Sequence, residues 1–180
     1  GTKYICEFEK DEYLHIMYAG IDGGEEKKLK KELECLKKDG PYLEDYISLL
    51  KEANGAILYS GSINIFGYDG RRKEVDSPTS VIRENKVDRV SSMLNQVIYI
   101  GNMPCESGGN INLYLNVKSR LVSGYYDDEI AVTWTSLEDF FSKVLPRYEE
   151  AYTDAGENVN RGKKDEAVYN NMQKYILKEN

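Results

Sequence analysis

The chain is poor in the residue types that build reactive or cross-linked sites. Its 180 residues include one histidine, one tryptophan, four prolines and three cysteines. A serine or cysteine hydrolase mechanism would need His15, which lies inside an alternating, strand-like segment. Three scattered cysteines indicate reduced thiols rather than a disulfide framework, and a structural zinc site needs about four nitrogen or sulfur ligands. We therefore expect a protein that is not an enzyme and that uses no metal or other cofactor.

Long apolar runs and an excess of positive charge are also absent. The apolar runs are too short to span a membrane, and no basic segment followed by an apolar one opens the chain as a signal peptide would. The 31 acidic residues exceed the 24 basic ones and leave a net charge of -7. Direct nucleic-acid binding is disfavoured, because it depends on Lys and Arg meeting phosphates. We expect a cytoplasmic protein without membrane association, and the sequence leaves its oligomeric state open.

Tyrosine is the one residue type in clear excess. Fifteen tyrosines stand beside only four phenylalanines. Tyr fills half-buried strand positions, which is the structural interpretation. It also supplies rigid aromatic contacts to recognition surfaces, which is the functional one.

The order of the hydrophobic patterns predicts an α+β fold. Helices are expected over 25–38, 42–53 and 136–148, the last with a capping-box pattern at Thr135 and Ser136. Asn54-Gly55 is expected to end the second helix. Strands are expected over 56–59, 63–66, 97–100, 110–117, 121–126 and 130–134. Strands gathered together with helices at the ends favour a single curved, mostly antiparallel sheet flanked by helices.

Three regions are expected along the chain. Residues 1–24 form an N-terminal hairpin extension, 25–152 form the main domain, and 153–180 form a linker and a C-terminal helix. The strand at 110–117 alternates cleanly, which predicts one face in the core and one face in water. A helical or loop segment is expected from Ser77 to about Leu94, and a loop over 102–109. Trp134 is expected to pack in the core.

Several short motifs resemble, in their order and spacing, the SUKH superfamily, which includes fungal cell-wall regulators and many bacterial immunity proteins. They are Pro41-x-x-x-x-Tyr46 leading to Asn54-Gly55, Gly109-Asn110 followed by Leu113-Tyr114-Leu115, the acidic hairpin of 122–129, and the Trp134–Phe140 block. The resemblance covers roughly residues 36–148. Gly40-Pro41 replaces the usual Leu-Pro, and the Gly109-Asn110 loop lacks the acidic residue often found near it. The resemblance implies a curved sheet with flanking helices, and a protein that binds another protein without catalysis.

Acidic residues concentrate towards the end of the resembling region. Between residues 124 and 154 there are eight acids and two bases, interleaved with aromatic side chains. This pattern suits capture of a basic partner, and the alternative interpretation is an acidic surface of no special role. Replacing its three consecutive carboxylates by Ser is expected to leave stability nearly unchanged. The candidate partner-binding residues are Tyr125, Tyr126, Asp127, Asp128, Glu129, Glu106 and Asn102.

The leading hypothesis is an immunity protein that binds and neutralises a cognate, cationic toxin domain of the nuclease type by stoichiometric occlusion. The alternative is a regulatory protein-interaction module of the fungal cell-wall regulator type. A third class, a carboxylate-based hydrolase, would use Asp127, Asp128 and Glu129 as acid, base or metal ligands. Three consecutive carboxylates on a turn point in diverging directions, which disfavours that third class.

Overall fold

The fold is a single open sheet with helices around it. The computed structural model describes residues 15–70, 77–104 and 109–150. Within these ranges, seven strands lie in the sheet in chain order, every neighbouring pair is antiparallel, and five α-helices surround them. This confirms the predicted α+β class with one sheet flanked by helices. No helix in the described part of the chain is long and apolar enough to cross a membrane.

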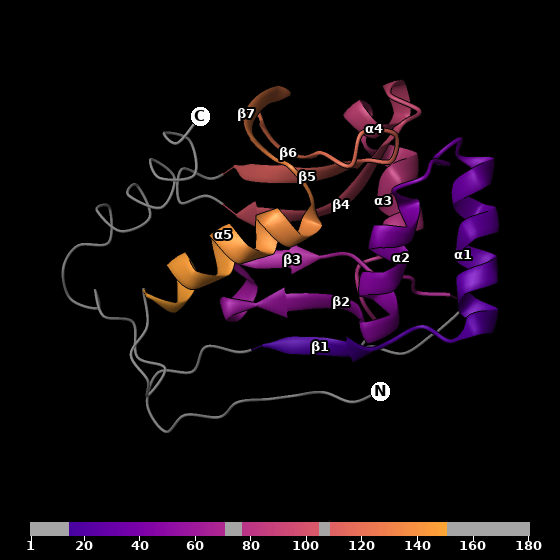
Figure 1. The fold of residues 1–180 in the computed structure, drawn as a ribbon, viewed down its shortest axis with the longest axis horizontal. Helices are drawn as coiled ribbons and strands as arrows, with labels where there is room; N and C mark the ends of the chain where they lie inside the picture. Colours follow the sequence, from indigo (N-terminus) through magenta and orange to yellow (C-terminus); the bar gives the residue numbers. More distant parts are fainter. Residues whose placement is uncertain (1–14, 71–76, 105–108, 151–180) are drawn as a thin grey trace.

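Figure 1 shows the strands and helices coloured in chain order. The strands are β1 (Ile16–Ala19), β2 (Ala53–Leu58), β3 (Ile63–Ile65), β4 (Val97–Pro104), β5 (Asn110–Asn116), β6 (Val122–Tyr126) and β7 (Glu129–Trp134). The helices are α1 (Gly23–Cys35), α2 (Leu43–Glu52), α3 (Val81–Val87), α4 (Arg89–Met93) and α5 (Leu137–Glu149), with a 3₁₀ turn at Tyr59–Gly61. Figure 1 shows α5 lying across one face of the sheet and α1 beyond the end of the sheet, beside α2.

One face of the sheet forms the core beneath α5. Trp134 is 4% exposed and meets Phe140 of α5 edge to face, with ring centroids 4.9 Å apart. Ser136 caps α5 by accepting a hydrogen bond from the Asp139 N–H, as the capping pattern predicted. The expected core position of Trp134 is therefore confirmed. The strand side chains of this face are buried: Ile98, Ile111, Leu113, Leu115, Val122 and Val132.

The first two helices differ in their bounds from the prediction. Helix α1 begins at Gly23 because the Asp22 side chain caps it in a capping box with Glu25. Helix α2 ends at Glu52, and Asn54-Gly55 lies in β2 rather than at a helix end, so that expectation was wrong. Gly55 has φ +86°, and a Cβ there would lie 2.8 Å from the Ile65 carbonyl oxygen, so glycine serves the close approach of β2 to β3.

Two buried asparagines replace missing strand partners. The Asn54 side chain accepts from the Tyr68 N–H at 2.6 Å and donates to the Tyr68 carbonyl at 2.8 Å. In the same way, the Asn85 side chain of α3 accepts from the Tyr99 N–H and donates to the Tyr99 carbonyl, both at 2.8 Å. Each amide thus pairs a backbone segment as a neighbouring strand would, because buried N–H and C=O groups need partners.

The segment between β3 and β4 holds two short helices where one segment was expected from Ser77. Ser80 caps α3 and Asp88 caps α4, each accepting a backbone hydrogen bond. Strand β4 runs to Pro104, so the loop expected from residue 102 begins later than predicted. The pairing of β4 with β5 shifts between Tyr99 and Gly101, which leaves Ile100 as a bulge. The sequence predicted a loop here because Gly101 and Pro104 are typical loop residues and because the bulge breaks the regular alternation of strand side chains.

The sheet extends further towards the N-terminus than expected. Strand β1 pairs antiparallel with β2, so residues 16–19 belong to the same sheet as the predicted domain 25–152. Residues 1–14 of the predicted hairpin extension, and the whole of the linker and C-terminal helix predicted over 153–180, lie outside the described residues. The helices predicted at 42–53 and 136–148 correspond to α2 and α5.

Removal of the Asn85 amide tests the strand-partner role. We expect Asn85→Ala to lower the free energy of unfolding by about 2–4 kcal/mol, because orphaned buried backbone groups cost about 1–3 kcal/mol each. Asn95→Ala, at an exposed position before β4, is the matched control and should stay within about 0.5 kcal/mol of the unmodified protein. Urea unfolding measures both; equal stabilities would show that Asn85 does not carry this role.

Candidate functional site

The predicted partner-binding residues gather partly at the tip of the β6–β7 hairpin. Asp127 and Asp128 form its two-residue turn, with φ of 50° and 64°. Positive φ at both turn positions matches the right-handed twist of the strands, and Asp tolerates that conformation better than most residues. The turn leaves Asp127, Asp128 and Glu129 exposed. We call these three residues the acidic tip.

The acidic tip lies beside α4. Asp128 forms an ion pair with Arg89 at 3.2 Å between Oδ2 and Nη1, and both side chains are exposed. Figure 1 shows the end of the hairpin curling on the α4 side of the sheet. Among the described residues, Asp127 and Glu129 have no ion pair. An exposed pair such as Arg89–Asp128 contributes about 0–1 kcal/mol, so the tip keeps most of its negative charge available.

The other acids between residues 124 and 150 do not join the acidic tip in one continuous patch. Asp139 accepts a hydrogen bond from the Thr135 N–H at 2.9 Å, which lowers the pKa of that carboxyl, and it pairs with Lys143 at 3.1 Å. Glu138 and Glu149 stand at opposite ends of α5, which has 13 residues and is therefore about 20 Å long. The acidic composition of the segment is thus distributed over the tip and a helix on the core side of the sheet.

A continuous row of side chains crosses all seven strands on the face opposite α5. Each member lies in register with the next, so all point to the same side of the sheet. We call it the cross-strand row: Ile16, Ile57, Asn64, Asn102, Asn112, Tyr125 and Ile130. All members are half-buried except Ile130, which is 59% exposed. Register thereby brings the predicted site residues Asn102 and Tyr125 onto one face.

Hydrogen bonds order the amides at the centre of the cross-strand row. Asn64 Nδ2 donates to Asn102 Oδ1 at 2.8 Å, and the Tyr99 hydroxyl donates to Asn112 Oδ1 at 2.9 Å. Asn102 Nδ2 makes a longer contact of 3.5 Å to the same hydroxyl. Burial raises the pKa of Tyr99, against an opposing effect of the Asn102 hydrogen bond, so the phenol stays a neutral donor. The amide groups are therefore held in fixed orientations.

Three tyrosines link this row to α4. Tyr99 and Tyr114 stack with centroids 5.0 Å apart, and Tyr125 meets Tyr114 edge to face at 4.9 Å. The Tyr114 hydroxyl donates to Asp88 at 2.9 Å; burial first, then Asp88, raises the pKa of Tyr114. The expectation of a fully wet face on β5 was therefore wrong at Tyr114, which is 2% exposed.

The remaining predicted site residues lie elsewhere. Tyr126 follows Tyr125 and lies against Gly109, where an added Cβ would stand 2.9 Å from the Tyr126 ring. It is not a member of the cross-strand row. Glu106 and Cys105 lie outside the described residues. The sequence prediction missed Asn64, Asn112 and the buried tyrosines, although the alternating asparagines of 110–116 and the tyrosine excess were visible.

Sequence reasoning also missed a buried lysine. Lysine side chains are mostly exposed in proteins, yet Lys38, at the end of the helix expected over 25–38, is 2% exposed. Its ammonium group donates to the Ser91 carbonyl and, at 2.9 Å, to the Leu94 carbonyl, which closes the end of α4. Burial lowers the pKa of Lys38, while the charge of Asp88 opposes that shift. Lys38 is therefore a structural cation that fastens the chain after α1 to α4.

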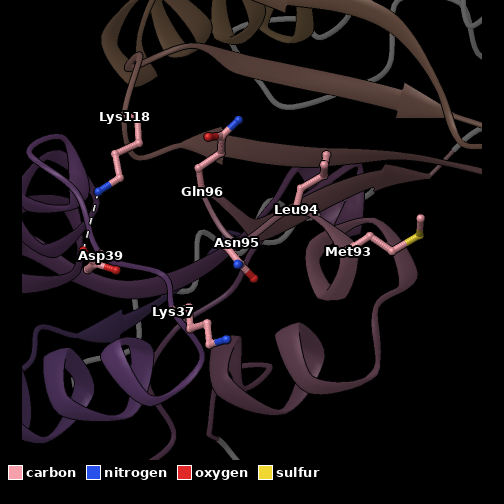
Figure 2. A pocket seen from close by; sticks show the side chains of 7 residues that line it. All are labelled: Lys37, Asp39, Met93, Leu94, Asn95, Gln96 and Lys118. Atoms are coloured by element: carbon pink, nitrogen blue, oxygen red, sulfur yellow. Dashed lines mark ion pairs between the residues drawn. The ribbon is translucent and has the colours of Figure 1, made fainter.

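A surface pocket of about 540 Å³ lies next to this lysine (Figure 2). Lys118 and Asp39 form an ion pair across it at 3.5 Å, and Met93 is 71% exposed at its rim. Figure 2 shows the two groups of the ion pair facing each other. The lining residues are Lys37, Asp39, Met93, Leu94, Asn95, Gln96 and Lys118. The lining therefore combines charges of both signs with the apolar side chains of Met93 and Leu94.

The described residues offer little chemistry for catalysis or metal binding. No three His, Cys, Asp or Glu side chains among them lie close enough together to hold a metal ion. His15 meets the ring of Tyr59 edge to face, with centroids 4.6 Å apart, and burial lowers its pKa while Glu149 opposes the shift. Cys35 is a free, exposed thiol, and Cys6 lies outside the described residues.

The turn conformation changes what should be expected of substitutions at the acidic tip. Positive φ costs an ordinary residue about 1–2 kcal/mol, whereas Asn accepts it. We therefore expect Asp127→Asn with Asp128→Asn to melt close to the unmodified protein, and Asp127→Ala with Asp128→Ala to melt measurably lower. Serine, which the sequence alone predicts to be neutral here, should also lower the melting temperature. Equal melting of the Asn and Ala pairs would show that the turn does not require these conformations.

Comparison with known proteins gives no family assignment. A scan against protein-family models finds no match, and a search of curated proteins finds no similar sequence. The resemblance to the SUKH superfamily stays a prediction from the motifs and their order. The acidic tip and the sheet face next to it are therefore the features that can support a functional proposal.

Proposed function

We propose that this protein is an immunity protein that neutralises a cationic, nuclease-type toxin domain by stoichiometric occlusion. The observation that carries the proposal is the acidic tip: three consecutive exposed carboxylates on a hairpin turn, next to the half-buried Tyr125. The motif resemblance points to the same class of function. The net charge of -7 adds a long-range attraction for a basic partner.

The mechanism is substitution of protein carboxylates for nucleic-acid phosphates. A nuclease surface that attracts phosphates presents Lys and Arg side chains, and carboxylates pair with the same groups through charge-assisted hydrogen bonds. The acidic tip stands on a hairpin whose two strands belong to the sheet, so its position is fixed before binding. A partner held there would lose access to its substrate without any chemical step by the immunity protein.

Electrostatic capture makes a kinetic prediction for the acidic tip. We expect Asp127→Asn, Asp128→Asn and Glu129→Gln together to slow association with the partner more than they speed dissociation, because complementary charge acts chiefly on the encounter rate. The effect should shrink as salt rises, since exposed charges are screened beyond about 8 Å at physiological ionic strength. Stopped-flow binding across a salt series measures this, with a panel of purified cationic, nuclease-type toxin domains as the probes.

A matched variant separates local charge from net charge. Glu138→Gln, Glu149→Gln and Glu150→Gln remove the same number of exposed carboxylates from α5 and its end. This control should associate with nearly the unmodified rate. Equal slowing of both triple variants would assign the effect to net charge alone, and absence of binding by the unmodified protein would contradict the proposed function.

A further inference from the structure

The sheet face opposite α5 carries no charged side chain from β3 to β7. Its residues present amides, hydroxyls, aromatic rings and one exposed isoleucine. Its accessible residues include Asn64, Asn102, Asn110, Asn112, Ser123, Tyr125, Ile130 and Thr133, while Tyr99 and Tyr114 on the same side of the sheet are buried. Charged residues make up 31% of the chain, so their absence from a partly exposed face departs from the rest of the surface. We call this surface the uncharged face.

Charged groups border the uncharged face at its β6–β7 end and beside α4. The acidic tip lies at its β6–β7 end, and Arg89 of α4 reaches Asp128 across the same side. Interfaces between proteins have this arrangement, with a centre depleted in charge, enriched in tyrosine and bordered by polar residues. Tyrosine adds large rigid contacts, while Asn and Ser adapt their hydrogen bonds to a partner.

The uncharged face is ordered before any partner arrives. The Asn64–Asn102 and Tyr99–Asn112 hydrogen bonds hold the central amides, and Tyr125 rests on the ring of Tyr114. Side chains already held in one orientation lose less conformational entropy on binding. The face is thus suited to a specific, rigid contact.

The negative charge of the acidic tip, at the border of the uncharged face, favours one kind of binding partner over others. A second copy of this chain would bring two acidic tips onto one interface, and like charges placed together disfavour it. A neutral glycan could use the amides and rings but would gain nothing from the carboxylates. A protein segment with an uncharged polar centre and basic residues beside it satisfies both the face and the tip.

We propose that the uncharged face, centred on Tyr125, is the docking surface for such a basic-flanked protein segment. The inference rests on the proposed function and deepens it: the acidic tip accelerates encounter, and the face provides the contact that holds the partner. Tyr125 is its aromatic anchor, because it is half-buried, lies in the cross-strand row between Asn112 and Ile130 and stands two residues before the tip.

A selection experiment tests the surface whichever toxin the protein binds. Random peptides displayed on phage are selected on the unmodified protein. We expect the selected peptides to carry net positive charge and to lose more than about tenfold in affinity on Ser123→Arg and on Tyr125→Ala. Ser142→Arg, which adds the same charge at an exposed position of α5, is the matched control and should bind as the unmodified protein does. Thermal melts identify any variant that fails to fold, and the two face variants perturb the surface in opposite ways.

The outcomes separate the docking surface from the neutralising function. Peptides that bind the Ser123→Arg and Ser142→Arg variants equally, or neutral glycans on an array that compete with the peptides, would overturn the docking surface. Association of the protein into dimers that Ser123→Arg disrupts would overturn it in favour of a second copy. Peptide binding confined to the face, together with failure to bind any of the cationic, nuclease-type toxin domains of the panel, would retain the surface and reject the function.

Discussion

The bulge in β4 is the constraint on which the candidate surface depends. Tyr99 pairs with Tyr114 before the bulge, and Asn102 pairs with Asn112 after it. If Ile100 were paired regularly, without the bulge, Asn102 would stand opposite Ile111 and point into the core, since a one-residue shift in register reverses every side chain. The Asn85 amide holds the Tyr99 backbone immediately before this point. A single side chain on α3 thus helps to fix which residues of β4 face the core and which face the uncharged side.

Short sequence patterns predicted the helices and strands whose caps or hydrophobic alternation lie within one helical turn or one strand. The alternation of Ile111, Leu113 and Leu115 places them in the core, and the cap at Ser136 places the start of α5. Asn54-Gly55 was misread because the same pair that ends helices also serves a close strand approach. Its true partner, Tyr68, lies beyond β3, where a short sequence window carries no information about it.

The candidate site also has one part that a local sequence pattern predicts and one part that depends on distant segments of the chain. The acidic tip was predictable, because its three acids follow two tyrosines between strand-like segments, and the structure places it on an exposed turn. The cross-strand row was not predictable, because it depends on six strand pairings formed between distant segments. Asn102 was predicted as a site residue, but its neighbours Asn64 and Asn112 emerge only from the register. The composition showed an excess of tyrosine, but it did not show that Tyr99, Tyr114 and Tyr125 would pack against one another on one face of the sheet.

The proposal gives two roles to two surfaces. The charge of the acidic tip speeds encounter with the partner, and the uncharged contacts of the sheet face keep the partner bound. Nuclear magnetic resonance of the asparagine side-chain amides tests this most directly, because each amide reports on its own surroundings. On addition of a cationic, nuclease-type toxin domain that binds this protein, the amide signals of Asn64, Asn102 and Asn112 should shift or broaden. Those of the buried Asn54 and Asn85 should stay in place and serve as internal references. Unchanged signals from the three row asparagines, with shifts confined to α5, would contradict the account.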